Sequence, residues 1–133
     1  MIKKQLIILF TITNLLVACK KETLNNDNEK IIHLNPPTWI QGTWLTSTNG
    51  FTEGFKFIYD DVIVISGNNE NSTKSVYTGD AKFVENIISN TYKYSVIVSG
   101  NNIPLNHFNK IDATHIKRID PDDGAIIETL TKQ

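Results

Sequence analysis

The chain is short of cysteine, arginine and clustered positive charge, and each shortage excludes a class of protein. Cys19 is the only cysteine, so no disulfide can form within the chain and packing alone must hold the core. Arg118 is the only arginine, and the lysines form no basic cluster of the kind that binds phosphate in nucleic acids. We therefore expect no nucleic-acid partner.

Motifs of catalysis are equally scarce. The chain has no Gly-x-Ser-x-Gly elbow and no glycine-rich phosphate loop. Its three histidines lack the spacing of metal ligands; they are His33, His107 and His115. Asp60 and Asp61 are adjacent, so in a strand they would point to opposite faces, which suits a turn better than an acid/base pair. We expect no enzyme.

The acidic run from Asp120 to Gly124 has two interpretations, a calcium loop or a hairpin turn. Its glycine comes one residue too early for a calcium loop, and no bidentate glutamate follows in register. We favour the hairpin turn, and we expect neither a metal nor a cofactor.

A hydrophobic run long enough to matter for export occurs at the start of the chain. Two lysines precede an apolar stretch of about a dozen residues, and the small Ala18 follows it. The stretch is shorter than the roughly 20 apolar residues that a membrane-spanning helix needs. Charged residues from Lys20 to Glu22 end it abruptly. The pattern predicts an export signal over residues 1–18.

The sequence Leu16-Val17-Ala18-Cys19 resembles the lipobox of bacterial lipoproteins. In that family the cysteine thiol receives a diacylglyceryl group, the signal is cut before it, and the new amino terminus is acylated, commonly with palmitate. The resemblance implies that Cys19 is lipidated and that its acyl chains anchor the protein in a membrane.

The segment after Cys19 is polar and lacks apolar periodicity. Residues 19–35 therefore predict a lipidated cysteine followed by a flexible tether. No aspartate follows Cys19, so the retention signal of the enteric inner membrane is absent. We expect a protein of the cell envelope, anchored to the outer membrane and facing the periplasm or the cell surface.

Residues 36–133 contain short β-like runs separated by Asn, Gly, Asp and Ser. Their spacing of about 8–12 residues predicts an all-β domain, a small antiparallel up-and-down meander forming a barrel or half-barrel. Aromatic residues alternate with polar ones in two of the runs, as in a strand with one buried face. The candidate strands are 42–46, 54–59, 62–66, 75–78, 82–88, 92–99, 103–108, 114–119 and 125–131.

The segment from Asp80 to Asn90 is ambiguous. Phe83, Ile87 and Ile88 have helical spacing after Asp80, which could cap a helix. Ser89 and Asn90 before the next strand indicate a hairpin instead. We favour the hairpin.

The sequence Gly42-Thr43-Trp44 resembles the Gly-x-Trp motif on the first strand of lipocalins. The resemblance extends over about residues 36–131 and is closest to the small lipocalin-like lipoproteins of Bacteroidetes. In that family the tryptophan packs at the base of the barrel beneath an arginine from near the last strand. The resemblance therefore implies that Trp44 packs against Arg118 in a cation–π contact.

Two functions follow as expectations. The first is a lipocalin-like module that binds a small apolar ligand in its barrel mouth. The expected lining comes from five aromatic residues: Phe55, Phe57, Tyr59, Tyr92 and Tyr94. The alternative is a protein-interaction lipoprotein, an inhibitor or immunity protein whose partner is an envelope protein. The small size of this chain and its Asn-rich loops favour the alternative.

Overall fold

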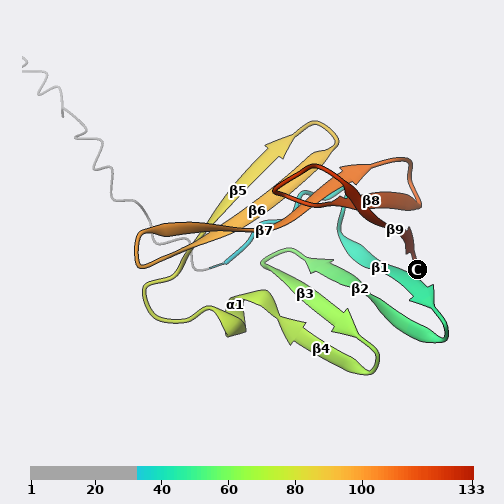
Figure 1. Ribbon diagram of the computed structural model, residues 1–133, viewed down its shortest axis with the longest axis horizontal. Coiled ribbons are helices and arrows are strands. Elements are labelled where there is room, and N and C mark those ends of the chain that lie inside the picture. Colours follow the sequence, from blue (N-terminus) through green and yellow to red (C-terminus); the bar gives the residue numbers. More distant parts are fainter. Residues whose placement is uncertain (1–32) are drawn as a thin grey trace, which may run out of the picture.

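Nine antiparallel strands and one short helix make up residues 33–133, the part of the chain that the computed structural model describes (Figure 1). The expected all-β meander is confirmed. Each strand pairs with its successor in the chain, except at the break between β4 and β5. The elements are β1 (Gly42–Thr48), β2 (Phe51–Ile58), β3 (Asp61–Ser66), β4 (Asn69–Ser72), α1 (Thr73–Val76), β5 (Lys82–Ile88), β6 (Thr91–Val98), β7 (Asn101–Lys110), β8 (His115–Ile119) and β9 (Ile126–Lys132).

Tight two-residue turns join most of these strands. In the β1–β2 turn, Asn49 and Gly50 have φ of 53° and 80°, and in the β6–β7 turn Ser99 and Gly100 have 51° and 81°. Positive φ at both positions is typical of type I′ turns, whose twist matches that of the strands. The local sequence therefore fixes where these hairpins reverse.

The sheet closes between its first and last strands and opens in the middle of the chain. β1 pairs with both β2 and β9, whereas β4 and β5 lie at the two ends of the strand order. The rings of Phe57 on β2 and Tyr92 on β6 lie 6.2 Å apart, although β1, β9, β8 and β7 separate their strands in the sheet. The sheet is therefore curled into a half-barrel, with α1 and the loop after it leading from one open edge to the other (Figure 1).

The concave face of the half-barrel holds the hydrophobic core. Alternate residues of β2 and β6 point inward, as the sequence pattern predicts. Five large aromatic side chains on this face pack together, and we call them the aromatic core: Trp44, Phe55, Phe57, Tyr92 and Phe108. The pairs Phe55–Phe108 and Phe57–Phe108 meet edge to face, with ring centroids 5.0 and 5.1 Å apart.

The segment between β3 and β5 differs from its sequence prediction. A strand was expected over 75–78 and none over 67–74, but β4 occupies Asn69–Ser72 and α1 follows at once. A turn of only two residues, Gly67 and Asn68, returns the chain alongside β3, so backbone pairing makes a strand of residues with poor β propensity. Ser72 then caps α1, its side chain accepting a hydrogen bond from the Ser75 N–H.

Other predictions can be compared directly. The hairpin interpretation of the segment from Asp80 to Asn90 is confirmed, because β5 and β6 pair across it. The run from Asp120 to Gly124 is the turn between β8 and β9, as favoured. Leu34, two residues before the expected domain start at Pro36, is fully buried in the core. The export signal, Cys19 and most of the tether lie outside the described residues.

Candidate functional site

A pocket of about 180 Å³ lies between the two arms of the open sheet, beside α1. We call it the α1 pocket. One side of it comes from β3, β4, α1 and the residue after α1, and the other side from β6 and β7. It therefore spans the gap that the missing β4–β5 pairing leaves. Its lining residues are Val64, Asn71, Thr73, Val76, Tyr77, Tyr94, Leu105 and Asn106.

Two adjacent acidic residues, Asp60 in the turn before β3 and Asp61 at its first position, hold α1 beside this pocket. The buried carboxylate of Asp61 accepts hydrogen bonds from its neighbour's backbone N–H, from the Ser72 hydroxyl and from the Lys74 N–H at 3.1 Å. Asp60 forms an ion pair with the Lys74 ammonium at 2.6 Å, and this hydrogen bond raises the pKa of Lys74. A helix of four residues is marginal alone, so these contacts hold it in place.

The polar groups of the α1 pocket are neutral. The Asn106 side-chain amide donates a hydrogen bond of 2.9 Å to the Tyr94 hydroxyl oxygen. Burial raises the pKa of Tyr94, so its hydroxyl keeps its proton at physiological pH. Val64, Val76 and Leu105 add apolar surface around this pair. The site can hold a small apolar molecule and offer it one or two hydrogen bonds.

A β-bulge turns β7 toward this pocket. Tyr94 pairs with Asn106, but Ser95 pairs with Pro104, so Leu105 is an extra residue without a partner on β6. A bulge bends its strand and changes the direction of its side chains. Leu105 packs against the hydrophobic core, and Asn106 reaches the Tyr94 hydroxyl. The bulge thus brings both residues to the pocket.

Four of the five expected lining residues are buried on the concave face, but they do not surround a deep cavity. Phe55, Phe57 and Tyr92 belong to the aromatic core and contact one another or Phe108. Tyr94 is the one member of the expected set that lines the α1 pocket. Close ring packing therefore fills the interior space in which the small apolar ligand was expected.

The expected role of Tyr59 is wrong. β2 ends at Ile58, and Tyr59 and Asp60 form the two-residue turn to β3. The Tyr59 side chain is 75% exposed and borders only an open surface hollow beside His33 and Lys74, away from the concave face. The alternation of β2 continues in the sequence for one residue after the strand has ended, which is why the pattern misleads.

The expected contact between Trp44 and Arg118 is also wrong. The register of β1 and β9 places Lys132 opposite Trp44, and the Lys132 ammonium lies 5.1 Å from the Trp44 ring. Arg118 instead lies 5.4 Å from the centre of the Phe55 ring and forms an ion pair of 2.5 Å with Glu128. Trp44 is fully buried, and its indole N–H donates to the Ile40 carbonyl at 2.6 Å. Both residues are structural here.

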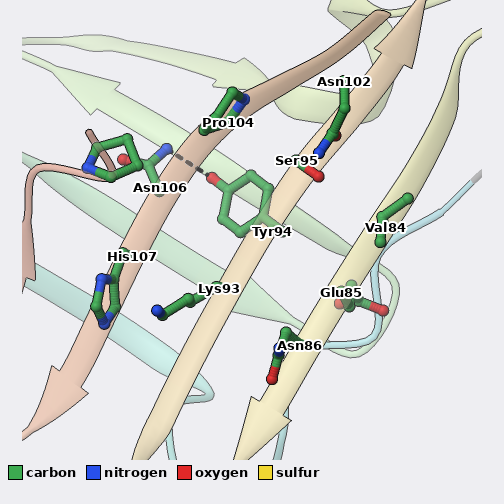
Figure 2. Close-up of a pocket in the computed structure, with 11 residues that line it drawn as sticks. Val84, Glu85, Asn86, Lys93, Tyr94, Ser95, Asn102, Pro104, Asn106 and His107 are labelled. Atoms are coloured by element: carbon green, nitrogen blue, oxygen red, sulfur yellow. Dashed lines mark hydrogen bonds between the residues drawn. The ribbon is translucent and has the colours of Figure 1, made fainter. Parts of the chain in front are cut away.

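A second hollow, of about 200 Å³, lies across β5, β6 and β7 (Figure 2). We call it the outer groove. Its side chains include Lys93, Ser95 and His107, which alternate with the inward-pointing Tyr92, Tyr94 and Phe108 and so face outward. Pro121, from the turn between β8 and β9, lies at its edge. The other lining residues are Val84, Glu85, Asn86, Tyr94, Asn102, Pro104 and Asn106.

Sequence reasoning missed most of the α1 pocket. Val64 lies in a predicted strand, but nothing in that strand distinguishes it from its apolar neighbours. Leu105 and Asn106 depend on the bulge, and Val76 depends on α1. Two signals for these features were available in the sequence. Pro104 falls within a predicted strand, where proline is typical of a bulge, and Ser72, a residue type that caps helices, comes directly before the four residues of α1.

Within residues 33–133, no three His, Cys, Asp or Glu side chains gather in a way that could hold a metal ion. The one helix among these residues, α1, lacks the length and hydrophobicity to cross a membrane. Comparisons with protein families, with curated proteins and with solved structures find no match to this chain.

Proposed function

We propose that this protein is a membrane-anchored lipoprotein of the cell envelope whose half-barrel binds a small, neutral, mostly apolar ligand in the α1 pocket. The observation that carries the proposal is the pocket itself, an apolar hollow with the Tyr94–Asn106 pair at its wall. The anchor rests on the sequence around Cys19.

The size of the pocket limits the ligand. Its volume of about 180 Å³ is below the roughly 300–1,000 Å³ of most drug-sized ligand sites. A dry apolar cavity of about 150 Å³ is large enough for benzene. The ligand class that fits is therefore a molecule of about one ring or a short branched chain, with a hydroxyl or carbonyl for the polar pair.

Native mass spectrometry of the mature protein, extracted gently from its own cells, tests this function first. A small bound mass at one copy per chain supports it. Leu105→Trp should fill the pocket and abolish that mass, whereas Ile103→Trp, on the same strand but exposed, should retain it. Binding of benzyl alcohol, followed by amide chemical shifts near Tyr94, gives a second measurement. Equal binding by both tryptophan variants would overturn the proposal.

The anchor has its own test. Cys19→Ser should abolish palmitate labelling and leave a precursor that is not cleaved. Labelling that persists in this variant would refute the assignment of Cys19.

A second candidate is a protein-interaction lipoprotein, because one edge of the sheet is apolar and free. β5 pairs with β6 alone among the described strands, and Val84, Ile87 and Ile88 are 44%, 48% and 64% exposed. Free strand edges accept extended segments of other chains. Cross-linking in native cells should then capture a stoichiometric envelope protein, and Ile87→Lys should release it. A protein that stays alone under these conditions would contradict this candidate.

A further inference from the structure

The outer groove carries a local positive charge that no side-chain carboxylate in the described residues neutralises. Ion pairs in residues 33–133 involve the cations of Lys56, Lys74 and Arg118, and a further contact joins His115 to Asp112. Lys93 takes part in none of them. Its ammonium therefore has room for an anionic partner. A lysine at the side of a hollow is a flexible donor that suits a carboxylate.

The one acidic side chain of the groove is already engaged elsewhere. Glu85 Oε1 accepts hydrogen bonds from the Tyr92 hydroxyl at 2.6 Å and from the Asn35 N–H at 2.8 Å. Tyr92 points to the concave face, so this carboxylate oxygen is drawn away from Lys93 on the outer face. The groove thus keeps its positive character.

His107 lies beside Lys93 and adds a second titratable group to the groove. The two residues are direct partners across β6 and β7, and the amino end of Lys93 reaches toward the His107 ring in Figure 2. Partial burial lowers the pKa of His107, and the nearby charge of Lys93 lowers it further. The Nε2 atom of His107 lies 3.1 Å from the side-chain oxygen of Asn109. An anion between them would pair with the Lys93 ammonium and would favour the protonated form of His107, in which Nδ1 becomes a donor while Nε2 stays bonded to Asn109.

Apolar surface flanks these donors. Pro104 and Pro121 contribute rigid rings, and Val84 contributes a half-exposed aliphatic side chain. Asn86 and Asn102 add neutral amides to the lining. We propose that the outer groove binds a small organic anion, a carboxylate on a flat apolar body, with the carboxylate at Lys93 and His107 and the body against the prolines. This site is separate from the function proposed for the α1 pocket.

Benzoate and benzyl alcohol separate the two sites, because they share a ring and differ in charge. On titration of the mature protein, benzoate should shift the side-chain resonances of Lys93 and His107, and benzyl alcohol should leave them unchanged. Lys93→Met, which keeps the length of the side chain, should weaken benzoate binding by about tenfold. Lys117→Met removes the same charge from β8, outside the groove, and should bind benzoate as the unaltered protein does.

Three results would overturn the proposal. The first is that benzoate shifts no resonance of a groove residue. The second is that benzyl alcohol binds in the groove equally well, and the third is that Lys93→Met binds benzoate with undiminished affinity. Lys93→Arg provides the charge-preserving comparison and should retain binding. Because benzyl alcohol reports on the α1 pocket, failure at the outer groove leaves the proposed function standing, and the reverse also holds.

Discussion

The aromatic core and the α1 pocket share one concave face, but they are filled by different means. In the aromatic core, Phe55, Phe57 and Phe108 contact one another through their rings and leave little room between them. In the α1 pocket, smaller residues such as Val64 and Leu105 leave a hollow of about 180 Å³, and a four-residue helix lies over it. The difference follows from the sheet, because strands flank the core closely while the pocket lies where β4 and β5 fail to meet.

This contrast indicates that stability and binding are assigned to separate parts of the interior. Close-packed rings stabilise a small domain that has no disulfide. A hollow near an open edge of the sheet lowers stability, because packing contacts are missing there, but it leaves room for a ligand. The following variants test whether the two regions differ as described.

Phe57→Ala should cause the largest loss. Phe57 is fully buried and contacts the rings of Phe55, Tyr92 and Phe108, so truncation should lower the free energy of unfolding by about 3–5 kcal/mol. Val64→Ala removes two carbons beside an existing hollow and should cost only about 1–2 kcal/mol. Denaturation in urea measures both. Equal losses would show that the two regions are packed alike.

Asp61→Ala should have an intermediate effect that is concentrated on α1. It leaves the Ser72 hydroxyl and the Lys74 N–H without their acceptor, at a cost of about 1–3 kcal/mol. Hydrogen exchange should show faster opening of residues 73–77, with the aromatic core still protected. Asp60→Ala removes a more exposed ion pair and should change stability by less than about 1 kcal/mol. Uniformly faster exchange would instead show that α1 and the core unfold together.

The smallest effect concerns alkaline pH. Burial raises the pKa of Tyr92 and of Tyr94, and the Tyr92 hydroxyl also donates to Glu85. The folded protein therefore holds these protons more firmly than the unfolded chain, whose tyrosines titrate near pH 10. Their stabilisation is complete below pH 10 and is lost as the pH rises above it.

Tyr92→Phe and Tyr94→Phe should each reduce this alkaline loss by a similar amount, because both hydroxyls keep their protons in the folded protein across the pH range measured. Tyr59→Phe, at an exposed ring, is the matched control. Thermal unfolding between pH 8 and pH 11 measures the dependence. A control variant that changed the curve as much as Tyr92→Phe would contradict the assignment.

Much of the fold could be predicted because it depends on local signals. Alternation in β2 and β6 identifies the buried face, and Ser89 and Asn90 identify the reversal between β5 and β6. The pocket could not be predicted, because it depends on register. One extra residue at Leu105 redirects β7, and the pairing of Trp44 with Lys132 decides which cation lies over the indole. Pro104 signals an irregularity in β7 but does not specify the extra residue, and no local pattern sets the register of β1 and β9.

The pairing of β1 with β9 has a consequence for how the chain could be reconnected. The Gln133 N–H donates to the Thr43 carbonyl at 2.9 Å, so the two ends of the sheet-forming chain are already adjacent. The natural order of strands starts and finishes in the interior of the sheet, while its free edges come from mid-sequence. A circular permutant that joins Gln133 to the segment before β1 and begins at Ala81 would start and finish at those edges. A native-like amide spectrum from such a chain would show that the unpaired gap, and not the position of the termini, defines this architecture.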